Sequence, residues 1–305
     1  MKIASSLTNP SEPVLAKILW HGVALFVVIV WGSTFASTRI LLNSLTPEQI
    51  LLYRSLIALV LLLLLARPRL VWRSVKTELL YLIAGVCGIT LYFIFENVAL
   101  LYTYSSNAAL LVTASPLFTV LIASFVFKTQ AFNQRILVAC LLALLGVGMV
   151  LANQSLSLSQ GLFGNLLALL AGLVWAFYNF AMEKVDDALS PILRTQKVFF
   201  YGIITTAVYM LVTGKHFVNQ AALEPLNLAN LGFLGVIASA LCYVLWNRAN
   251  HHLGVVQTSL YLYFMPLVAV VLGVWLLAEH ITWMTVMGGL LITLAVVLAN
   301  AKKNG

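Results

Sequence analysis

The chain has 305 residues, of which 62% are hydrophobic and only 9% are charged. A soluble globular protein carries about 25% charged and roughly 45–50% apolar residues, so this chain could not cover its surface in water. The composition therefore excludes a soluble enzyme, a nucleic-acid-binding domain and a disordered chain. One helical crossing of a bilayer takes about 20 residues, so the chain has room for roughly ten crossings and no soluble domain.

The formal net charge of +8 comes from Lys and Arg residues that cluster between apolar runs, most densely from Arg67 to Lys76. Such clusters are typical of cytoplasmic loops of membrane proteins, and we expect no nucleic-acid partner. Cys87, Cys140 and Cys242 each fall inside an apolar run. An odd, scattered set predicts neither a disulfide framework nor a metal site, and we expect no metal or other cofactor.

Apolar runs follow one another along the whole chain. In lipid the backbone amides must pair within their own segment, so each run predicts a transmembrane helix and the fold class is all-α. The runs cover residues 18–42, 48–66, 79–101, 105–127, 135–153, 161–183, 191–213, 230–250, 254–278 and 282–300. The longest connection, residues 213–229, is expected to lie along the membrane interface.

The orientation follows from the distribution of Lys and Arg in the loops. Basic residues concentrate on the side of the N-terminus, whereas the opposite side keeps only Arg39 and Lys215. Because positively charged loops stay in the cytoplasm, we predict that both termini are cytoplasmic. The N-terminal tail then covers residues 1–17 and the C-terminal tail residues 301–305.

The sequence contains an internal repeat. Trp31 and Pro47 are separated by the same spacing as Trp175 and Pro191, 144 positions further on. In both halves a hydroxyl residue directly precedes the proline. A shift of 150 positions then pairs Gly85 with Gly235, Asn97 with Asn247 and Pro116 with Pro266. The collinear order of tryptophan, asparagine and proline predicts a duplication, with repeats over residues 18–153 and 161–300.

Each predicted repeat contains five helices. Because five is odd, the second repeat must enter the membrane upside down relative to the first. Inverted repeats characterise secondary transporters, which bind substrate near the bilayer midplane between the repeats and expose it alternately to either side.

Several short motifs in this order resemble the EamA-type carriers of the drug/metabolite transporter superfamily. The motifs are Val30 to Phe35, Tyr53-Arg54, Thr103 to Ala109, Tyr261 to Pro266 and Leu277 to His280. The resemblance implies a multi-pass carrier of the bacterial inner membrane, often an exporter of amino acids or other small metabolites. The chain departs from the family at Lys128 to Gln130, where many relatives carry a Gly-Glu pair like Ala278-Glu279.

A central cavity is expected where polar and aromatic side chains lie near the middle of the helices. Trp31 and Trp175 occupy equivalent places in the first and sixth helices, and amides should not face lipid. The predicted lining residues are Trp31, Thr34, Asn97, Asn107, Trp175, Tyr178, Asn179, Gln257 and Tyr261. The alternative for the aromatic residues is packing or an interfacial belt.

Pro116 and Pro266 fall about midway along the fourth and ninth helices. A proline there bends the helix and frees a carbonyl group. Two interpretations remain open: a kink that lines the cavity, or a kink that only shapes the bundle.

Arg54 and Glu96 lie within apolar runs at similar predicted depths below the outer surface. A buried charge in a bilayer usually faces the interior with a partner, so an Arg54–Glu96 ion pair is one hypothesis. The second is that each side chain reaches separately to the outer interface. The third is that Glu96 is unpaired and couples transport to protons.

Arg194 and Lys197 lie in the first turns of the seventh helix, on the cytoplasmic side. Long basic side chains near a helix end commonly extend to lipid headgroups. The alternative is that they contact an anionic group of the substrate.

The sequence therefore predicts a secondary transporter, and not an enzyme, that exports a small metabolite such as an amino acid or a similar amphipathic solute. Its partners are this small molecule, membrane lipid and, as the candidate coupling ion, the proton. A channel or lipid-translocating protein is the alternative. An intramembrane enzyme fits less well because the histidines are dispersed.

Overall fold

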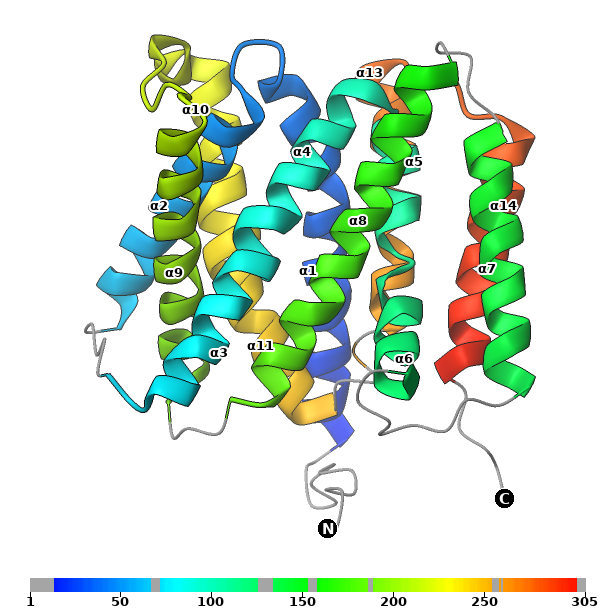
Figure 1. Ribbon diagram of the computed structural model, residues 1–305, viewed down its shortest axis with the longest axis horizontal. Helices are drawn as coiled ribbons and strands as arrows, with labels where there is room; N and C mark the ends of the chain where they lie inside the picture. Colours follow the sequence, from blue (N-terminus) through cyan, green and yellow to red (C-terminus); the bar gives the residue numbers. More distant parts are fainter. Residues whose placement is uncertain are drawn as a thin grey trace.

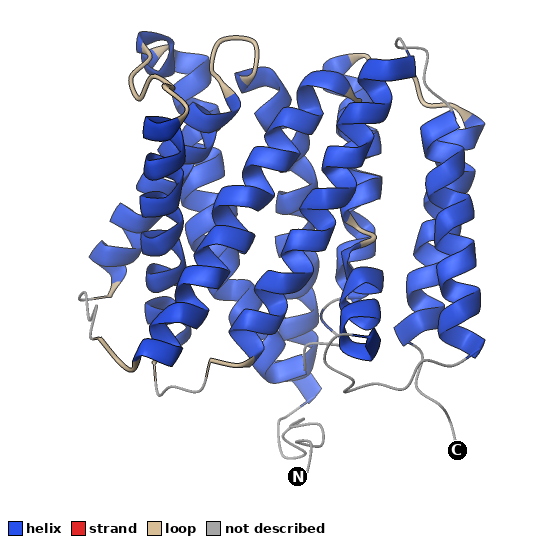
Figure 2. Ribbon diagram, viewed as in Figure 1, coloured by secondary structure: helices blue, strands red, loops and turns tan. Residues whose placement is uncertain are grey.

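A computed structural model describes residues 14–66, 72–125, 134–152, 158–185, 189–253, 258 and 260–300. Every element in this described part is a helix (Figure 2), as the predicted all-α class requires. Six helical stretches are long and apolar enough to cross a membrane: Ile18–Leu41, Pro47–Leu65, Val75–Tyr102, Gly161–Glu183, Pro191–Val212 and Pro225–Ala249. Shorter apolar helices cover Leu137–Val150, Tyr261–Leu277 and Trp283–Ala295. These lengths and compositions are those of a multi-pass membrane protein.

The elements of the first half of the chain are α1 (Val14–Leu41), α2 (Pro47–Leu65), α3 (Val75–Gly85), η1 (Val86–Leu91), α4 (Tyr92–Tyr102), α5 (Ser105–Val112), α6 (Ser115–Phe125) and α7 (Gln134–Ala152). Those of the second half are α8 (Leu158–Glu183), α9 (Pro191–Val212), η2 (Gln220–Leu223), α10 (Pro225–Gly232), η3 (Phe233–Leu241), α11 (Cys242–Leu253), η4 (Leu260–Phe264), α13 (Met265–Leu277) and α14 (Trp283–Asn300). The segments η1 and η3 are π-helical, whereas η2 and η4 are 3₁₀ helices.

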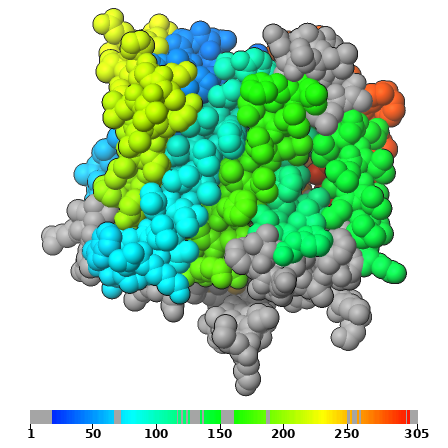
Figure 3. All heavy atoms as spheres, viewed as in Figure 1, coloured from blue at the N-terminus to red at the C-terminus, as the bar shows by residue number. Residues whose placement is uncertain are grey.

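The helices lie side by side in one bundle, and α1 begins at the same end at which α14 finishes (Figure 1). Helix α1 packs against α11 and α13, and α2 packs against α9 and η3. Along the face seen in Figure 3, α9, the stretch from α3 to α4, α8 and α7 follow one another. Apolar side chains on the outside, such as Leu64, Leu144 and Trp275, are more than two-thirds exposed, as expected of a surface that faces lipid.

The repeated pairs of a hydroxyl residue and a proline are helix starts. The Thr46 hydroxyl accepts a hydrogen bond from the Gln49 amide at 3.3 Å, and the Gln49 side chain accepts one from the Thr46 amide at 3.1 Å. The Ser190 hydroxyl likewise accepts from the Leu193 amide at 3.5 Å. Such caps satisfy amides at the first turn, and the proline that follows needs no hydrogen bond there.

Three helical stretches begin four or five residues earlier than the apolar runs predict, at Val14, Val75 and Pro225 instead of residues 18, 79 and 230. Polar capping residues and a first-turn proline set two of these starts, because Ser74 caps α3 and Pro225 opens α10. The predicted interfacial connection after α9 consequently contains η2 and the first turns of α10.

Both prolines predicted to bend helices follow directly on an interruption of the α-helix. A turn at Thr113 and Ala114 separates α5 from α6, in which Pro116 is the second residue. The 3₁₀ segment η4 precedes α13, in which Pro266 is the second residue. Proline is tolerated in the first turn of a helix, where its missing N–H has no helical partner, so a new helix starts at each site.

Helices α7 and α14 form a closely packed pair at one edge of the bundle (Figure 1). Gly146 and Gly288 allow this approach, since a side-chain carbon added to either would collide with the carbonyl oxygen of the other. Small residues at helix contacts are a common device in membranes, because they let two backbones come close together.

Candidate functional site

A cavity lies among helices of both halves of the chain. Its aromatic residues are Trp31, Phe35, Tyr92, Phe93, Trp175 and Tyr243. Its polar residues are Thr34, Arg54, Glu96, Thr113 and Ser115. The apolar residues Val112, Leu262 and Met265 complete the lining. Helices α1, α2, α4, α5 and α6 contribute from the first half, and α8, α11, η4 and α13 contribute from the second.

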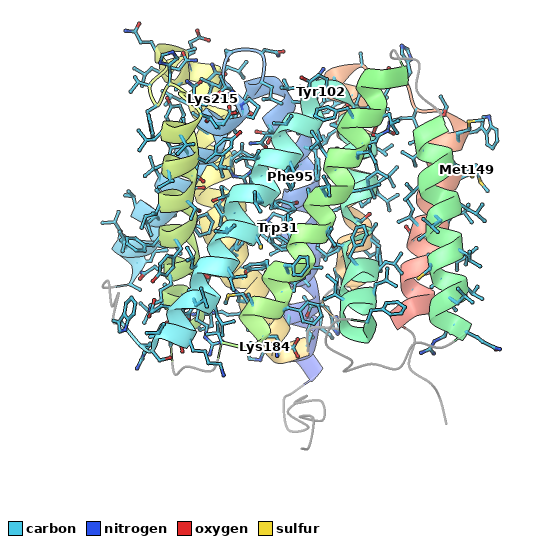
Figure 4. All side chains as sticks on the ribbon, viewed as in Figure 1. Trp31, Phe95, Tyr102, Met149, Lys184 and Lys215 are labelled. Atoms are coloured by element: carbon cyan, nitrogen blue, oxygen red, sulfur yellow. The ribbon has the colours of Figure 1, made fainter. Side chains whose placement is uncertain are left out.

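Trp31 places this cavity near the middle of the bundle. Figure 4 shows Trp31 about midway between Lys215, near one end of the helices, and Lys184, near the other. The site is therefore far from both ends, at the level where a carrier would hold its substrate away from both solutions.

The aromatic side chains of the two halves meet in direct ring contacts. The rings of Trp31 and Trp175 lie 6.4 Å apart between centroids in an edge-to-face arrangement. Trp31 also contacts Tyr243 at 5.7 Å, and Trp175 contacts Tyr92 at 5.0 Å. The Trp31 indole N–H donates a hydrogen bond of 2.9 Å to the Ala238 carbonyl oxygen in η3. This bond fixes a first-half side chain to the π-helical segment of the second half.

Arg54 of α2 is only 2% exposed and makes its contacts with both halves. Its Nε and Nη2 atoms donate to the Ser239 hydroxyl in η3 at 3.2 and 3.1 Å. Its guanidinium carbon lies 4.0 Å from the centre of the Phe93 ring, a cation–π contact. Its Nη1 atom is buried and has no hydrogen-bond partner in the described structure.

Glu96 of α4 is 1% exposed and shares a side-chain hydrogen bond with Tyr92, one turn earlier on the same helix. Its Oε1 atom is buried without a hydrogen-bond partner among the described residues. The cavity therefore contains one cationic and one anionic side chain, each with an unpartnered polar atom.

Arg54 and Glu96 differ from two of the three predicted arrangements. Separate extension to the outer interface is wrong, because both side chains are almost completely buried. No direct ion pair joins these two described residues, since Ser239 holds the guanidinium group instead. The two side chains nevertheless line the same cavity, which brings their charges into one binding volume.

Of the side chains predicted to line a central cavity, Trp31, Thr34 and Trp175 do so. Tyr178 is buried beside them, with its ring 4.7 Å from that of Trp175, but it is not part of the lining. Tyr178 instead packs where Gly88 of η1 leaves room, because a side-chain carbon on Gly88 would collide with the Tyr178 ring.

Two predicted amides bind helices to one another instead of lining the cavity. Asn97 donates from Nδ2 to the Pro47 carbonyl oxygen at 3.0 Å and so links α4 to the start of α2. Asn107 accepts from the Thr285 hydroxyl at 3.5 Å and links α5 to α14. Both amides are buried, so helix packing satisfies the requirement that they avoid lipid.

The remaining predicted cavity residues lie elsewhere. Asn179 is exposed, one turn before α8 ends at Glu183. The Tyr261 hydroxyl shares a 2.7 Å hydrogen bond with His21 Nδ1, which connects η4 to α1 outside the cavity. Gln257 lies outside the described residues.

The two basic residues predicted to lie on the cytoplasmic side, Arg194 and Lys197, show a second difference from the predictions. Lys197 is buried and forms an ion pair with Glu78 of α3. The Tyr201 hydroxyl donates to the same carboxylate at 2.7 Å, and the Arg73 amide donates to it at 2.9 Å. An internal ion pair therefore replaces the predicted headgroup or anion contact at Lys197. Arg194 is half-buried in the first turn of α9 and is not a cavity residue.

Glu279, noted in the sequence for its family motif, caps α5. Its Oε1 accepts from the Ser105 amide at 2.6 Å, and its Oε2 accepts from the Ser106 amide at 3.2 Å and the Ser106 hydroxyl at 2.7 Å. Ala278 has a φ of 51°, in the left-handed region, which ends α13 and turns the chain. Lys128, at the corresponding departure from the family pattern, lies outside the described residues.

Sequence reasoning missed Phe93, Tyr243 and Ser239 as members or supports of the cavity. A signal for the first two was present: the 150-residue shift pairs Phe93 with Tyr243, and both are aromatic. Ser239 had no such signal, because its partner Arg54 comes from another helix.

The chemistry of the lining suits noncovalent binding. The aromatic rings offer apolar surface, and Arg54 and Glu96 offer hydrogen bonds to charged groups. Among the described residues, no group of three or more His, Cys, Asp or Glu side chains is placed to hold a metal ion.

Comparison with known proteins gives matches over nearly the whole chain. The sequence profile of the EamA-like transporter family matches twice, over residues 18–152 and 162–301. An "Uncharacterized transporter" of Archaeoglobus fulgidus is 28% identical over 294 residues, 93% of this chain and 98% of that protein. A "Probable terminal-alkyne amino-acid exporter" of Streptantibioticus cattleyicolor is 26% identical over 294 residues, 95% of this chain and 96% of that protein.

A solved crystal structure superposes with a TM-score of 0.61, covering 93% of this chain and 96% of its own. The sequence identity in this comparison is 18%, so the likeness shows a shared fold and nothing about the solute.

Proposed function

The chain belongs to the EamA-like transporter family, and from this premise we propose that it is a secondary carrier that exports a small amphipathic metabolite by alternating access. The proposed solute class is an amino acid or a similar molecule. The observation that carries the proposal is the central cavity, to which both halves contribute apolar and aromatic side chains and the first half adds the charged Arg54 and Glu96.

We propose ten crossings arranged as two inverted five-helix repeats. The six long apolar stretches, the shorter apolar helices and the double match of the family profile support this arrangement. Backbone irregularities recur as well: the π-helical segments η1 and η3 and the interruptions before Pro116 and Pro266 all correspond under the 150-residue shift. Inherited bends at equivalent places are expected if the two halves arose by duplication.

Support for the direction and the solute comes from the relatives and the lining. One relative, 26% identical, is named as an exporter of a terminal-alkyne amino acid. A cavity with aromatic walls and a few polar groups matches a solute that has an apolar body and charged ends. We propose the bacterial inner membrane as the location, with both termini cytoplasmic, from the distribution of Lys and Arg in the loops.

Counterflow in proteoliposomes tests the carrier mechanism. Vesicles containing purified protein are loaded with an unlabelled amino acid and diluted into a trace of the labelled one. A carrier accumulates label transiently above the external level and saturates with concentration, because loaded sites exchange across the membrane. A channel gives simple equilibration, and a lipid-translocating protein gives no solute flux, so either result rejects the proposal.

A further inference from the structure

We infer that Arg54 and Glu96 bind the two opposite charges of one zwitterionic solute, and that Ser239 positions Arg54 for this role. This inference deepens the proposed function by naming which charges the solute carries and which atoms receive them. It starts from two unpartnered atoms of opposite charge in one cavity, Arg54 Nη1 and Glu96 Oε1.

The guanidinium group of Arg54 is oriented before any solute arrives. Two of its nitrogens donate to the Ser239 hydroxyl, and the Phe93 ring lies against its face. These contacts leave Nη1, which carries two N–H groups, without an acceptor among the described residues. A carboxylate is the acceptor that matches a guanidinium group best in charge and geometry.

The carboxylate of Glu96 offers the negative charge that complements the positive charge of Arg54. Tyr92 forms a hydrogen bond with this carboxyl group, whereas its Oε1 atom has no donor among the described residues. An ammonium group supplies three donors and the opposite charge, so it satisfies Oε1 and leaves donors for neighbouring oxygens. Thr34, which also lines the cavity, donates its hydroxyl proton to the Trp31 carbonyl oxygen, so its own oxygen can accept such a bond.

Burial explains why one solute should carry both charges. A charged side chain that is fully buried and incompletely paired is strongly unfavourable in a low-dielectric interior. A solute with only a carboxylate would satisfy Arg54 and leave Glu96 Oε1 unpaired, and a simple amine would do the reverse. A zwitterion compensates both side chains and adds no net charge to the site, while its apolar part contacts Trp31 and Trp175.

Ser239 acts in this scheme as a positioning residue. Its hydroxyl is the only hydrogen-bond acceptor of Arg54 among the described residues, and it comes from η3 in the other half of the chain. Removing the hydroxyl should let the guanidinium group change its orientation, whereas threonine keeps an oxygen at the same place. Affinity for the carboxylate should therefore fall in Ser239→Ala and recover in Ser239→Thr.

The first test varies the solute and leaves the protein unchanged. Binding to purified protein in detergent is followed by tryptophan fluorescence for two series, each with one apolar body. The series are L-phenylalanine, phenethylamine and 3-phenylpropanoate, and L-leucine, 3-methylbutylamine and 4-methylpentanoate. We expect at least one zwitterion to bind about tenfold or more tightly than both of its singly charged analogues, because each analogue leaves a buried charge unpaired. Equal binding within both series, or no binding of either zwitterion, overturns the inference.

The second test assigns each charge to its side chain. In Glu96→Gln the zwitterion should lose its advantage over the acid, and in Arg54→Gln it should lose its advantage over the amine. Glu48→Gln is the matched control, because Glu48 is a buried carboxylate on the helix of Arg54 but pairs with Lys215 outside the cavity. An equal loss for all three solutes in the Glu96 and Arg54 variants indicates a purely structural role and overturns the assignment.

The inference and the proposed function fail in different ways. Selective binding of a zwitterion without counterflow supports the two-charge site and rejects the carrier mechanism. Counterflow of a solute that lacks one of the two charges, at the rate of the zwitterion, supports the carrier and rejects the two-charge site.

Discussion

Single residues link the cavity to its surroundings through hydrogen bonds that cross between the halves of the chain. Arg54 reaches Ser239, and Trp31 reaches the Ala238 carbonyl oxygen, so two adjacent residues of η3 hold two side chains from the first half. A movement of η3 against α1 and α2 would therefore move the Arg54 and Trp31 side chains that line the cavity. This connection makes individual substitutions informative.

Glu96 is the residue at which coupling to protons can be tested. Its carboxyl group is buried beside Arg54, Tyr92 and Tyr243, and binding a proton would remove an incompletely paired charge. We expect Glu96→Gln to abolish the dependence of transport on external pH, measured in proteoliposomes at saturating solute between about pH 6 and 8. Retention of the wild-type pH profile in this variant would exclude Glu96 as the coupling group.

The buried Lys197–Glu78 pair is a residue-scale test of stability. Removing one partner leaves a buried charge without compensation, which typically destabilises a protein by about 3–5 kcal/mol. Glu78→Gln and Lys197→Met should each lower the thermal unfolding midpoint in detergent clearly. The combined variant Glu78→Leu with Lys197→Met should recover part of the loss.

A suitable control for this pair is the contact between Glu48 and Lys215, whose lysine side chain is 44% exposed. Because Glu48 itself is buried, Lys215→Met should lower the midpoint, but less than Lys197→Met, since water reaches the Lys215 end of this contact. Equal effects at Lys197 and Lys215 would contradict the importance of burial.

At the scale of elements, helix ends and helix contacts set the framework around the cavity. The N-terminus of α5 is buried, and Glu279 satisfies its amides from the far end of α13. Since α5 supplies Val112 to the cavity and leads into Thr113, this cap holds one wall in place. A carboxylate at a helix N-terminus also interacts favourably with the helix dipole.

We predict that Glu279→Ala destabilises the protein by about 2 kcal/mol, because it leaves buried amide donors of α5 without an acceptor. Glu279→Gln retains one acceptor oxygen and should lose less. Ala278→Gly is the neighbouring control, since glycine adopts the left-handed conformation of this position more easily than alanine. Thermal unfolding of the three variants checks the order, and a loss for Ala278→Gly as large as that for Glu279→Ala would refute it.

The glycines of α7 offer a matched pair of substitutions. A side chain at Gly146 would collide with the Gly288 carbonyl oxygen and with Ile292 of α14, whereas Gly148 has open space around it. Gly146→Val should therefore separate the two helices and cost about 1–3 kcal/mol. Gly148→Val should have little effect, and thermal unfolding of both variants makes the comparison. Indistinguishable midpoints would show that close contact between α7 and α14 is unimportant.

At the scale of the whole molecule, the cavity receives residues from helices throughout the chain, whereas α7 and α14 form an edge pair and contribute none of its described lining. The described lining of the cavity thus lies apart from the α7–α14 pair.

The orientation of the whole protein in the membrane can be tested by chemical labelling. Val218, 81% exposed in the connection after α9, should face the outside, and the exposed Lys184 at the end of α8 should face the cytoplasm. A membrane-impermeant thiol reagent should label Val218→Cys in intact cells, and Lys184→Cys only after permeabilisation. The reverse pattern would invert the proposed topology. The unsubstituted protein, whose cysteines lie within helices, gives the background.

The sequence predicted the helices well because bilayer thickness and backbone hydrogen bonding limit the possible lengths of apolar segments. It also predicted Trp31, Thr34 and Trp175 as cavity residues, because position along a helix fixes their depth. The family resemblance was confirmed by the double match of the family profile.

Side-chain partners on other helices could not be predicted in the same way. Asn97 and Asn107 look like cavity residues in a hydropathy profile, yet each bonds to a neighbouring helix. Lys197 pairs with Glu78, more than a hundred positions earlier in the chain. Such partners depend on how each helix is rotated and packed against its neighbours, and neither can be predicted from composition.

The π-helical segments have a consequence for the angular phase of the helices that contain them. An α-helix advances about 100° per residue, and a π turn accommodates an additional residue, so the face presented after η1 or η3 is offset from the face presented before it. Phe93 and Glu96 follow η1, and Tyr243 follows η3. A helical wheel continued unchanged through either segment would therefore assign these residues to the wrong side. Deleting one residue within a π segment would rotate the helix that follows it about its own axis. The cavity residues would keep their identity but would turn toward neighbouring helices.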